Sequence, residues 1–293
     1  MAEPCGNHSN FSDDCGADRG RDHVVPAPLE VRANVHQSLN RVLILLAASL
    51  ALACSGFAQL AKGIPPHGKL VRLFNGKDFT GFDILLLSKG LNHDTEKIFQ
   101  VEKGVIHVSG DDFGGIVTQK EYENYYLRAQ FKWGEKTWQD RVGKARDCGI
   151  LYNVTGPLPA PPKGVWPRSF EFQIIEGGTG DIWLVKGASL KVNGQVIASE
   201  AEEGPHQFVK SRRFGGGPWQ NVTGFRDPAG EVEKPHGEWN QLELVVDHEH
   251  VKYFVNGKLV NEATDLNATR GKILFQTEGA ETFYRNLELA PLK

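Results

Sequence analysis

The segment from residue 166 to residue 183, WPRSFEFQIIEGGTGDIW, joins a strand-like stretch to a glycine-rich stretch and carries three acids. In an extended strand Glu171 and Gln173 share one face, while the intervening aromatic and aliphatic residues occupy the other. A regular continuation would turn Glu176 to the apolar face. The glycines of EGGTGD permit a bulge or turn, through which we expect Glu176 and Asp181 to return towards Glu171.

Three carboxylates in one neighbourhood suit two kinds of chemistry. They can serve in general acid/base catalysis, or their oxygens can hold a divalent cation such as Ca²⁺. We therefore take Glu171, Glu176 and Asp181 as the candidate catalytic residues. A half-exposed strand followed by an acidic turn fits the same spacing, because an E-x-Q pattern is not specific in itself.

Other polar and aromatic residues could belong to the same surface and contact a substrate. Indole rings can stack on the C–H faces of sugars, although core packing accounts for each tryptophan equally well. Carboxylates, amides and guanidinium groups can bind hydroxyl groups. The candidate substrate-binding residues are Arg146, Asp147, Tyr152, Trp166, Arg168, Gln173, Trp183, Gln276 and Glu278. No fingerprint of a nucleophilic serine, a phosphate-binding loop or a dinucleotide site is present, so no organic cofactor is indicated.

The elements that must position these residues are strands. From about residue 70 onward, apolar residues recur with a period of two, which is the repeat of a β-strand. The stretches YYLRAQFKW (125–133) and WNQLELVVD (239–247) alternate in this way. HVKYFVNGKLVNEA (250–263) reads as a hairpin turned at Asn256-Gly257, a pair suited to a type I′ turn. The sequence therefore predicts an all-β fold, a two-sheet antiparallel β-sandwich of the jelly-roll type.

Two parts of the chain depart from this pattern. Residues 188–234 break the strand rhythm, and we expect a long loop excursion, a feature that is usually functional. Residues 1–40 are polar, and we expect a disordered extension or a translation start assigned too early. The remaining residues are read as a signal peptide over 41–58, a linker over 59–69 and the jelly-roll domain over 70–293.

The apolar run 42–53 after Arg41 is typical of the hydrophobic region of a signal peptide and is too short to span a membrane. We expect a periplasmic or secreted protein whose mature chain begins at Gln59. The alternative is a lipoprotein anchored at Cys54. Either cleavage leaves Cys148 without a partner for an internal disulfide.

The charge balance narrows the class of partner. The formal net charge is −3 at pH 7, and no block of lysine and arginine is present. Nucleic-acid binding requires a clustered basic excess, so a nucleic-acid partner is not expected. A sugar or oligosaccharide is the expected partner, and the sequence does not set the oligomeric state.

Four stretches in this order resemble the 3-keto-disaccharide hydrolase family. They are LFNGKDFTGF (73–82), FEFQIIEGGTGDIWLV (170–185), GEWNQLELVVDHEHVKYFVNGKLVNEA (237–263) and GKILFQTEGAETFYRNLELAPL (271–292). The resemblance covers residues 71–292. It implies a concanavalin A-like jelly roll with its site on the concave face, and an exported carbohydrate-active protein.

Some members of this family cleave glycosides that are oxidised at C3, which the resemblance extends to this chain as an expectation. A ketone at C3 acidifies the proton at C2, so a base can remove it and expel the group at C1. Glu171 is the expected acid/base residue, with Glu176 or Asp181 as its partner. Ordinary hydrolysis by two carboxylates remains open, as does a non-catalytic carbohydrate-binding module on the same sandwich.

Overall fold

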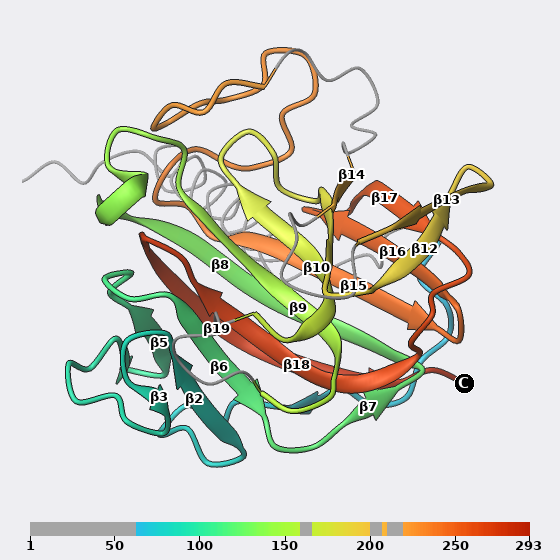
Figure 1. The fold of residues 1–293 in the computed structure, drawn as a ribbon, viewed down its shortest axis with the longest axis horizontal. Helices are drawn as coiled ribbons and strands as arrows, with labels where there is room; N and C mark the ends of the chain where they lie inside the picture. The colour runs from blue at the N-terminus through green and yellow to red at the C-terminus, as the bar shows by residue number, and fades with distance from the viewer. Residues whose placement is uncertain (1–62, 159–165, 200–206, 210–218) are drawn as a thin grey trace, which may run out of the picture. The chain divides into compact units, whose positions relative to one another are not determined.

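The period-two alternation of the sequence forms two large antiparallel sheets that lie face to face (Figure 1). The structure, a computed structural model, describes residues 63–158, 166–199, 207–209 and 219–293. These residues belong to one unit, Leu60–Lys293. The expected N-terminal extension, signal peptide and Cys54 lie outside the described residues, as does the linker up to residue 62.

The first sheet contains the long central strands and the C-terminal strand. In spatial order its strands are β17 (Lys258–Ala263), β16 (His250–Val255), β15 (Asn240–Asp247), β8 (Tyr125–Thr137), β19 (Ala280–Pro291), β5 (Val105–Val108) and β4 (Phe99–Glu102), with β1 (Val71–Arg72) paired to β19.

The second sheet contains the strand with the candidate acid. In spatial order its strands are β14 (Gln207–Val209), β11 (Ile182–Val185), β10 (Arg168–Ile175), β9 (Asp147–Thr155), β18 (Arg270–Thr277), β6 (Gly114–Thr118), β2 (Phe82–Leu86) and β3 (Gly90–Leu91), with β7 (Tyr122–Glu123) paired to β18. A hairpin of β12 (Ser189–Val192) and β13 (Gln195–Ala198) forms a small third sheet.

Helical structure is nearly absent from the described ranges, where η1 (Gln139–Arg141), a short 3-10 helix, is the only helical element. No helix of the described part is long and apolar enough to cross a membrane. The prediction of an all-β, two-sheet antiparallel sandwich is confirmed. The region 188–234, expected as a loop excursion, contains β12, β13 and β14, and its residues 200–206 and 210–218 lie outside the described residues.

The core fills the space between the sheets with alternate residues of both. Phe170, Phe172 and Ile174 of β10 are fully buried there. The Phe172 ring stacks on Tyr253 of β16, with ring centroids 4.3 Å apart and an interplanar angle of 6°. The Tyr253 hydroxyl donates to the Tyr152 hydroxyl at 2.8 Å. The two sheets are thus held together through contacts of β9 and β10 with β16.

The position of Tyr152 corrects one expectation. Tyr152 was expected to contact a substrate, but it lies in the core and stacks on Phe170. The reason is parity, because Cys148, Ile150 and Tyr152 alternate along β9 and all three point between the sheets.

The predicted hairpin turn is also present. Asn256 and Gly257 both have positive φ, at 50° and 79°. Positive φ at both central residues defines the type I′ turn, whose twist matches that of the flanking strands. The turn closes β16 onto β17 and so fixes the register of the first sheet's edge.

Replacing Phe172 tests whether this core holds the two sheets together. We expect Phe172→Ala to lower the free energy of unfolding by about 3–5 kcal/mol, because it removes a buried ring and leaves a cavity. Chemical denaturation measures this loss. The matched control is Val196→Ala, since Val196 is 67% exposed; equal losses in the two variants would contradict the packing described.

Candidate functional site

The outer face of the second sheet gathers acids and amides from three adjacent strands. Glu171 and Gln173 of β10 point outward because their neighbours fill the core. Gln173 pairs with Gly149 of β9, which places Asp147 on the same face. Gln276 of β18 shares this face, since the preceding residue is in the core. The alternation predicted for β10 is therefore found, and two neighbouring strands add to it.

Gly149 lets two of these side chains come together. A Cβ atom at Gly149 would lie 2.5 Å from Gln276 Oε1 and closer still to Glu171 Oε1. The ends of Glu171 and Gln276 therefore occupy the space that a side chain at this position would fill. Glycine at 149 is a packing requirement of the site, and any larger residue would displace the Glu171 carboxyl.

Arg141 links the remaining acids. Its guanidinium contacts the Asp147 carboxylate and lies 3.2 Å from Glu278 Oε1. Gln173 Nε2 donates to Asp147 Oδ1 at 2.9 Å. Five residues thus form one group, in which Gln173, Asp147, Arg141 and Glu278 are joined directly and Glu171 lies alongside them.

A glycine also positions Arg141. Gly279 has a φ of +73°, and a Cβ atom there would lie 2.7 Å from Arg141 Cγ. The Trp138 backbone N–H donates to the Gly279 carbonyl at 2.8 Å. The end of β18 and the loop around η1 are therefore held together, which brings Arg141 to Glu278.

The electrostatics of the group follow from burial and from a shortage of positive charge. Burial raises the pKa of Glu171 well above its ordinary value, and Glu278 and Asp147 raise it further, with partial opposition from Gln276 and Arg141. Burial likewise raises the pKa of Asp147 and of Glu278, and Arg141 opposes both shifts.

Arg141 itself remains charged. Burial alone would lower its pKa, but Asp147 and Glu278 raise it above its usual value. One guanidinium therefore faces three carboxyl groups. Asp147 and Glu278 contact it directly, whereas Glu171 has no ion pair with the described residues. A buried carboxyl without a cationic partner is the one that keeps its proton, so we assign the proton to Glu171.

Two amide oxygens complete the polar surface. Gln173 Oε1 and Gln276 Oε1 are buried and accept no hydrogen bond from the residues that the structure describes. They flank Gly149 on neighbouring strands. A buried acceptor of this kind needs a donor from ordered water or from a bound molecule.

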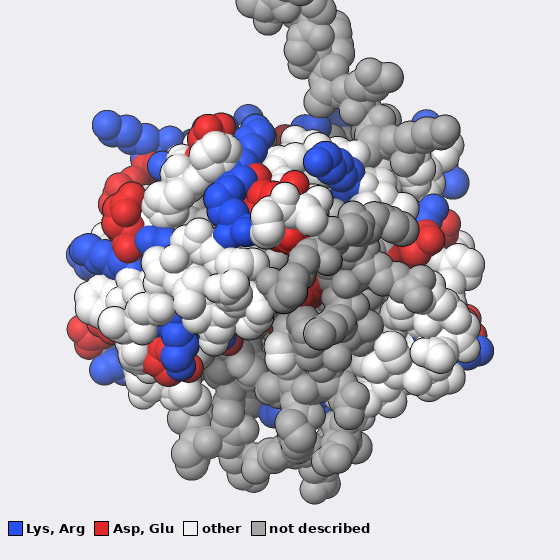
Figure 2. All heavy atoms as spheres, turned by 90° about the horizontal axis from the view of Figure 1, so that it is seen from above, with Lys and Arg blue, Asp and Glu red and all other residues white. Residues whose placement is uncertain are grey.

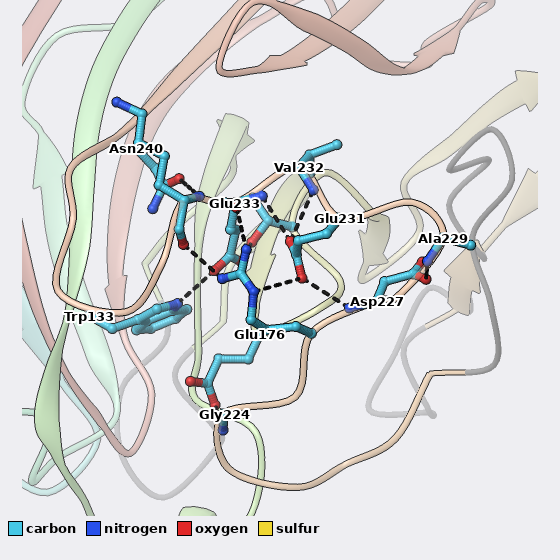
Figure 3. Close-up of polar contacts among 12 residues, drawn as sticks. Trp133, Glu176, Gly224, Asp227, Ala229, Glu231, Val232, Glu233 and Asn240 are labelled. Atoms are coloured by element: carbon cyan, nitrogen blue, oxygen red, sulfur yellow. Dashed lines mark hydrogen bonds and ion pairs between the residues drawn. The ribbon is translucent and has the colours of Figure 1, made fainter.

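The structure does not bring Glu176 and Arg146 to this group; Figure 3 shows Glu176 beside Gly224. Glu176 accepts hydrogen bonds from Arg146 Nη1 at 2.7 Å, from the Arg146 backbone N–H at 2.9 Å and from the Gly224 backbone N–H at 2.8 Å. Arg146 Nη2 also donates to the Glu135 carbonyl of β8. Both side chains thus point towards the first sheet, as strand parity requires, and the expected return of Glu176 does not occur.

Asp181 and Trp183 extend the outer face on the other side of β10. The Gln173 backbone N–H donates to the Asp181 carbonyl at 3.0 Å, and Trp183 pairs with Glu171. Ile182 between them is buried in the core, so Asp181 and Trp183 share the face of Glu171. Asp181 therefore returns to this face, as the glycine turn predicted.

Two further predicted residues lie on neighbouring parts of the sheet. Trp166 packs on an outer-face apolar cluster that contains Leu151 and Leu274. Arg168 donates to Thr155 Oγ1 at 2.8 Å and is held at the edge of β9. Neither contacts the carboxyl group of Glu171 through any described interaction.

Sequence reasoning missed Arg141, the residue that joins the acids. It lies in the loop WQDRVGKARD, which follows no strand period. The position of the Arg141 side chain depends on its contact with Gly279, which lies more than a hundred residues later in the sequence. Only a three-dimensional arrangement could reveal that pairing.

The carboxyl groups do not form a metal-binding set. Within the described ranges, no cluster of three or more His, Cys, Asp or Glu side chains is arranged to hold a metal ion. In the candidate site the guanidinium of Arg141 occupies the position between Asp147 and Glu278 that a cation would need. The acidic residues expected as possible Ca²⁺ ligands are thus not arranged as such.

A second buried acid lies near Glu176, in the network drawn in Figure 3. Glu233 Oε2 accepts from Trp133 Nε1 at 3.1 Å, and Glu233 Oε1 contacts the Thr179 hydroxyl. That hydroxyl also lies 3.2 Å from the Ile175 carbonyl. It has one hydrogen and cannot donate to both. A protonated Glu233 resolves this, since it donates to Thr179 while Thr179 donates to Ile175.

Charges of both signs are interspersed over the face shown in Figure 2. Blue and red side chains lie next to one another there, without an extended patch of either. This distribution agrees with the small net charge of −3, and the described residues of that face form no basic tract.

Comparison with known proteins shows a family match. Residues 69–290 match the model of the 3-keto-alpha-glucoside-1,2-lyase-like domain, which confirms the resemblance seen in the sequence. No curated protein sequence matches the chain.

Several solved structures are similar to the chain. Two are Parabacteroides distasonis ATCC 8503 proteins provisionally described as glycosyl hydrolases. One is 22% identical, with a TM-score of 0.47, over 76% of this chain and 94% of the other. The second is 18% identical, with a TM-score of 0.44, over 77% and 100%. The Bacillus licheniformis β-glucanase is 14% identical, with a TM-score of 0.41, over 77% and 99%. At these values, the structures carry no functional argument for this chain.

A methyl group at position 149 tests the arrangement of the site. We expect Gly149→Ala to displace the Glu171 carboxyl and to abolish most ligand binding or turnover, while the protein stays folded. Circular dichroism and a binding or activity assay measure the two effects. Gly194→Ala is the control for a glycine outside the site: a Cβ atom there would meet nothing within 4 Å, and its φ of +76° makes this change costly for stability but not for function. Unchanged function in Gly149→Ala would contradict the site.

The pH dependence of stability tests the protonated state of Glu233. Burial raises its pKa from 4.5 to about 7. The folded protein therefore binds this proton more tightly than the unfolded chain. The proton on Glu233 therefore contributes roughly 3 kcal/mol to the free energy of unfolding. This contribution is complete below about pH 4.5 and is lost as the pH rises to about 7.

The Glu233→Gln variant cannot titrate at this position and keeps a donor for Thr179. We expect its free energy of unfolding, relative to the natural protein, to increase between about pH 4.5 and pH 7. Chemical denaturation at several pH values measures the difference. A difference that does not change with pH would show that Glu233 is ionised in the folded protein.

Proposed function

Because the chain belongs to the 3-keto-alpha-glucoside-1,2-lyase-like domain family, we propose that it is a glycosidase-type enzyme acting on glycosides oxidised at C3. One observation supports this most strongly. Glu171 lies over Gly149 without an ion pair to the described residues, beside Asp147 and Glu278, which share Arg141. One carboxyl thus lacks a cationic partner while the other two share one, an arrangement that sets the pKa values of neighbouring carboxyl groups apart, as acid/base chemistry requires.

Glu171 supplies the acid. Its pKa is raised by burial and by the neighbouring carboxylates, so the group holds a proton at a pH where an exposed glutamate would be ionised. In the proposed reaction it transfers that proton to the glycosidic oxygen as the bond to C1 breaks. Proton transfer of this kind typically accelerates a reaction about 10²–10⁴-fold.

Glu278 is the proposed base. Its side chain is 17% exposed and that of Asp147 only 3%, so Glu278 is the carboxyl group beside Arg141 that a substrate can reach. It removes the proton from C2, and the electron pair of the C2–H bond forms an enolate with the ketone at C3. The enolate then forms the C1=C2 double bond and expels the glycosidic oxygen, which takes the proton of Glu171.

The products of this elimination are the free aglycone alcohol and an unsaturated 3-keto sugar. Addition of one water across C1 and C2 gives the free 3-keto sugar, so the two steps together consume one water. Arg141 supports the enolate as the positive charge next to Glu278. The buried acceptors Gln173 Oε1 and Gln276 Oε1 are placed to receive sugar hydroxyl groups.

Substitution of Glu171 tests the proposed acid. We expect Glu171→Gln to reduce kcat/KM on a 3-keto-disaccharide by about 10²–10⁴-fold, because the amide cannot deliver a proton. Release of the free sugar measures the rate, with the unoxidised parent disaccharide as the substrate control. The matched control is Glu243→Gln, since Glu243 is equally buried but is bonded to Tyr126 of the first sheet. A fully active Glu171→Gln variant would remove Glu171 from the mechanism.

Reaction in D₂O distinguishes elimination from direct hydrolysis. Elimination and hydration place a solvent deuterium at C2, whereas hydrolysis by two carboxylates leaves the C2 hydrogen in place. Proton NMR of the product measures this, and product incubated without enzyme controls for spontaneous exchange. Sugar binding without cleavage of either disaccharide would instead support a carbohydrate-binding module.

We also propose that the protein is exported, on the basis of the apolar run after Arg41. Cell fractionation followed by N-terminal sequencing tests this. A periplasmic or secreted chain that begins at Gln59 is expected, and a lipid-modified chain that begins at Cys54 would favour the anchored form. A cytoplasmic chain that retains residues 41–58 would contradict export.

A further inference from the structure

A cavity of about 440 Å³ lies at the same end of the second sheet as Glu278 and Arg141. It is formed by the turn between β2 and β3, the loop between β5 and β6, and the residues that open η1. Its polar and aromatic lining includes Ser88, Ser109, Asp111, Asp112, Trp138 and Gln139. The volume is within the range of small-ligand sites, about 300–1,000 Å³.

The walls of this cavity are joined directly to the candidate site. The Thr277 hydroxyl donates to the Asp112 carbonyl at 2.9 Å, and Glu278 is the next residue. The Trp138 backbone N–H donates to the Gly279 carbonyl at 2.8 Å. Two backbone segments, 277–279 and 138–141, thus border both the cavity and the candidate site.

The lining is preorganised for a ligand that is part apolar and part hydroxylated. Trp138 Nε1 donates to the Ser109 carbonyl at 2.9 Å, which fixes the indole. Gln139 Nε2 donates to the Asp111 carbonyl at 2.9 Å, which fixes the loop. The Asp111 side chain is exposed and makes no hydrogen bond with the described residues, so its carboxylate is available to hydroxyl donors.

The charges of the cavity argue against an anionic ligand. Lys89, its only lysine or arginine, pairs with Glu96 at 3.3 Å. Asp111 and Asp112 add negative charge, and Asp112 already accepts from the Ser88 hydroxyl at 2.5 Å. A phosphate or a carboxylate would find no free cation here among the described residues, whereas a neutral polyol finds acceptors and an aromatic ring.

We propose that this cavity binds a further pyranose ring of the carbohydrate substrate, adjacent to the ring that reacts at Glu171. Trp138 contributes its indole to the apolar side of the ring, and Asp111 accepts from the hydroxyl groups. The inference rests on the proposed function only in the identity of the substrate as a carbohydrate. If the cavity binds such a ring, the affinity of the protein for an oligosaccharide grows with the number of rings.

Calorimetric titration of the Glu171→Gln protein with unoxidised gluco-oligosaccharides of one, two and three rings tests the proposal without catalysis. We expect at least one added ring to increase affinity about tenfold or more. The Asp111→Ala substitution, made in the Glu171→Gln protein, should remove that gain and leave the affinity for the shortest ligand unchanged. Trp138→Ala should do the same, and Trp138→Phe should keep part of the gain.

Matched controls are Asp247→Ala and Trp239→Ala, which alter partly exposed residues at the end of β15 and directly before it. Affinity that is independent of ring number, or that falls equally for all lengths in Asp111→Ala, would overturn the proposal. If 3-keto-disaccharides are not cleaved but affinity still grows with ring number, the ring-binding role of the cavity is supported and the proposed reaction is contradicted. If 3-keto-disaccharides are cleaved but affinity does not depend on ring number, the proposed reaction is supported and the ring-binding role of the cavity is contradicted.

Discussion

Three carboxyl groups share one guanidinium on the outer face of the second sheet, and the chemistry of the site depends on this imbalance. Arg141 contacts Asp147 and Glu278 and leaves Glu171 without a cationic partner among the described residues. Burying an isolated carboxylate costs more free energy than keeping it protonated. The same shortage of positive charge therefore makes Glu171 the carboxyl that holds its proton most tightly.

The fold serves this arrangement from both sides of the second sheet. On the inner face, Phe170 and Phe172 anchor β10 in the core, so that Glu171 between them must point outward. Arg146 directly precedes β9 and Glu176 directly follows β10. Their ion pair, with Nη1 and Oε1 2.7 Å apart, fixes the backbone next to Asp147. Both partners of that pair are buried and bonded, so it acts as a support for the site and takes no part in its proton chemistry.

Sequence alone predicted the parts of the site that follow from strand parity. The alternation of β10 placed Glu171 and Gln173 outward, and the glycines after Ile175 placed Asp181 on the same face. The same parity, applied to Cys148 and Ile150, would have placed Tyr152 in the core, so that error was avoidable. Arg141 and the inward turn of Glu176 depend on loop contacts far apart in the sequence, which no local period encodes.

The central claim is that Glu171, the buried carboxyl without a cationic partner, keeps its proton to a higher pH than Asp147 and Glu278 do. A carbon-13 NMR titration of the side-chain carboxyl groups, with Glu171→Gln used to assign the resonance, measures this directly. The account predicts that the Glu171 carboxyl carbon titrates well above the usual glutamate value of about 4.3, and at a higher pH than the carboxyl carbons of Asp147 and Glu278. A Glu171 resonance that titrates near that usual value would show that the site holds no neutral acid, and would contradict the account.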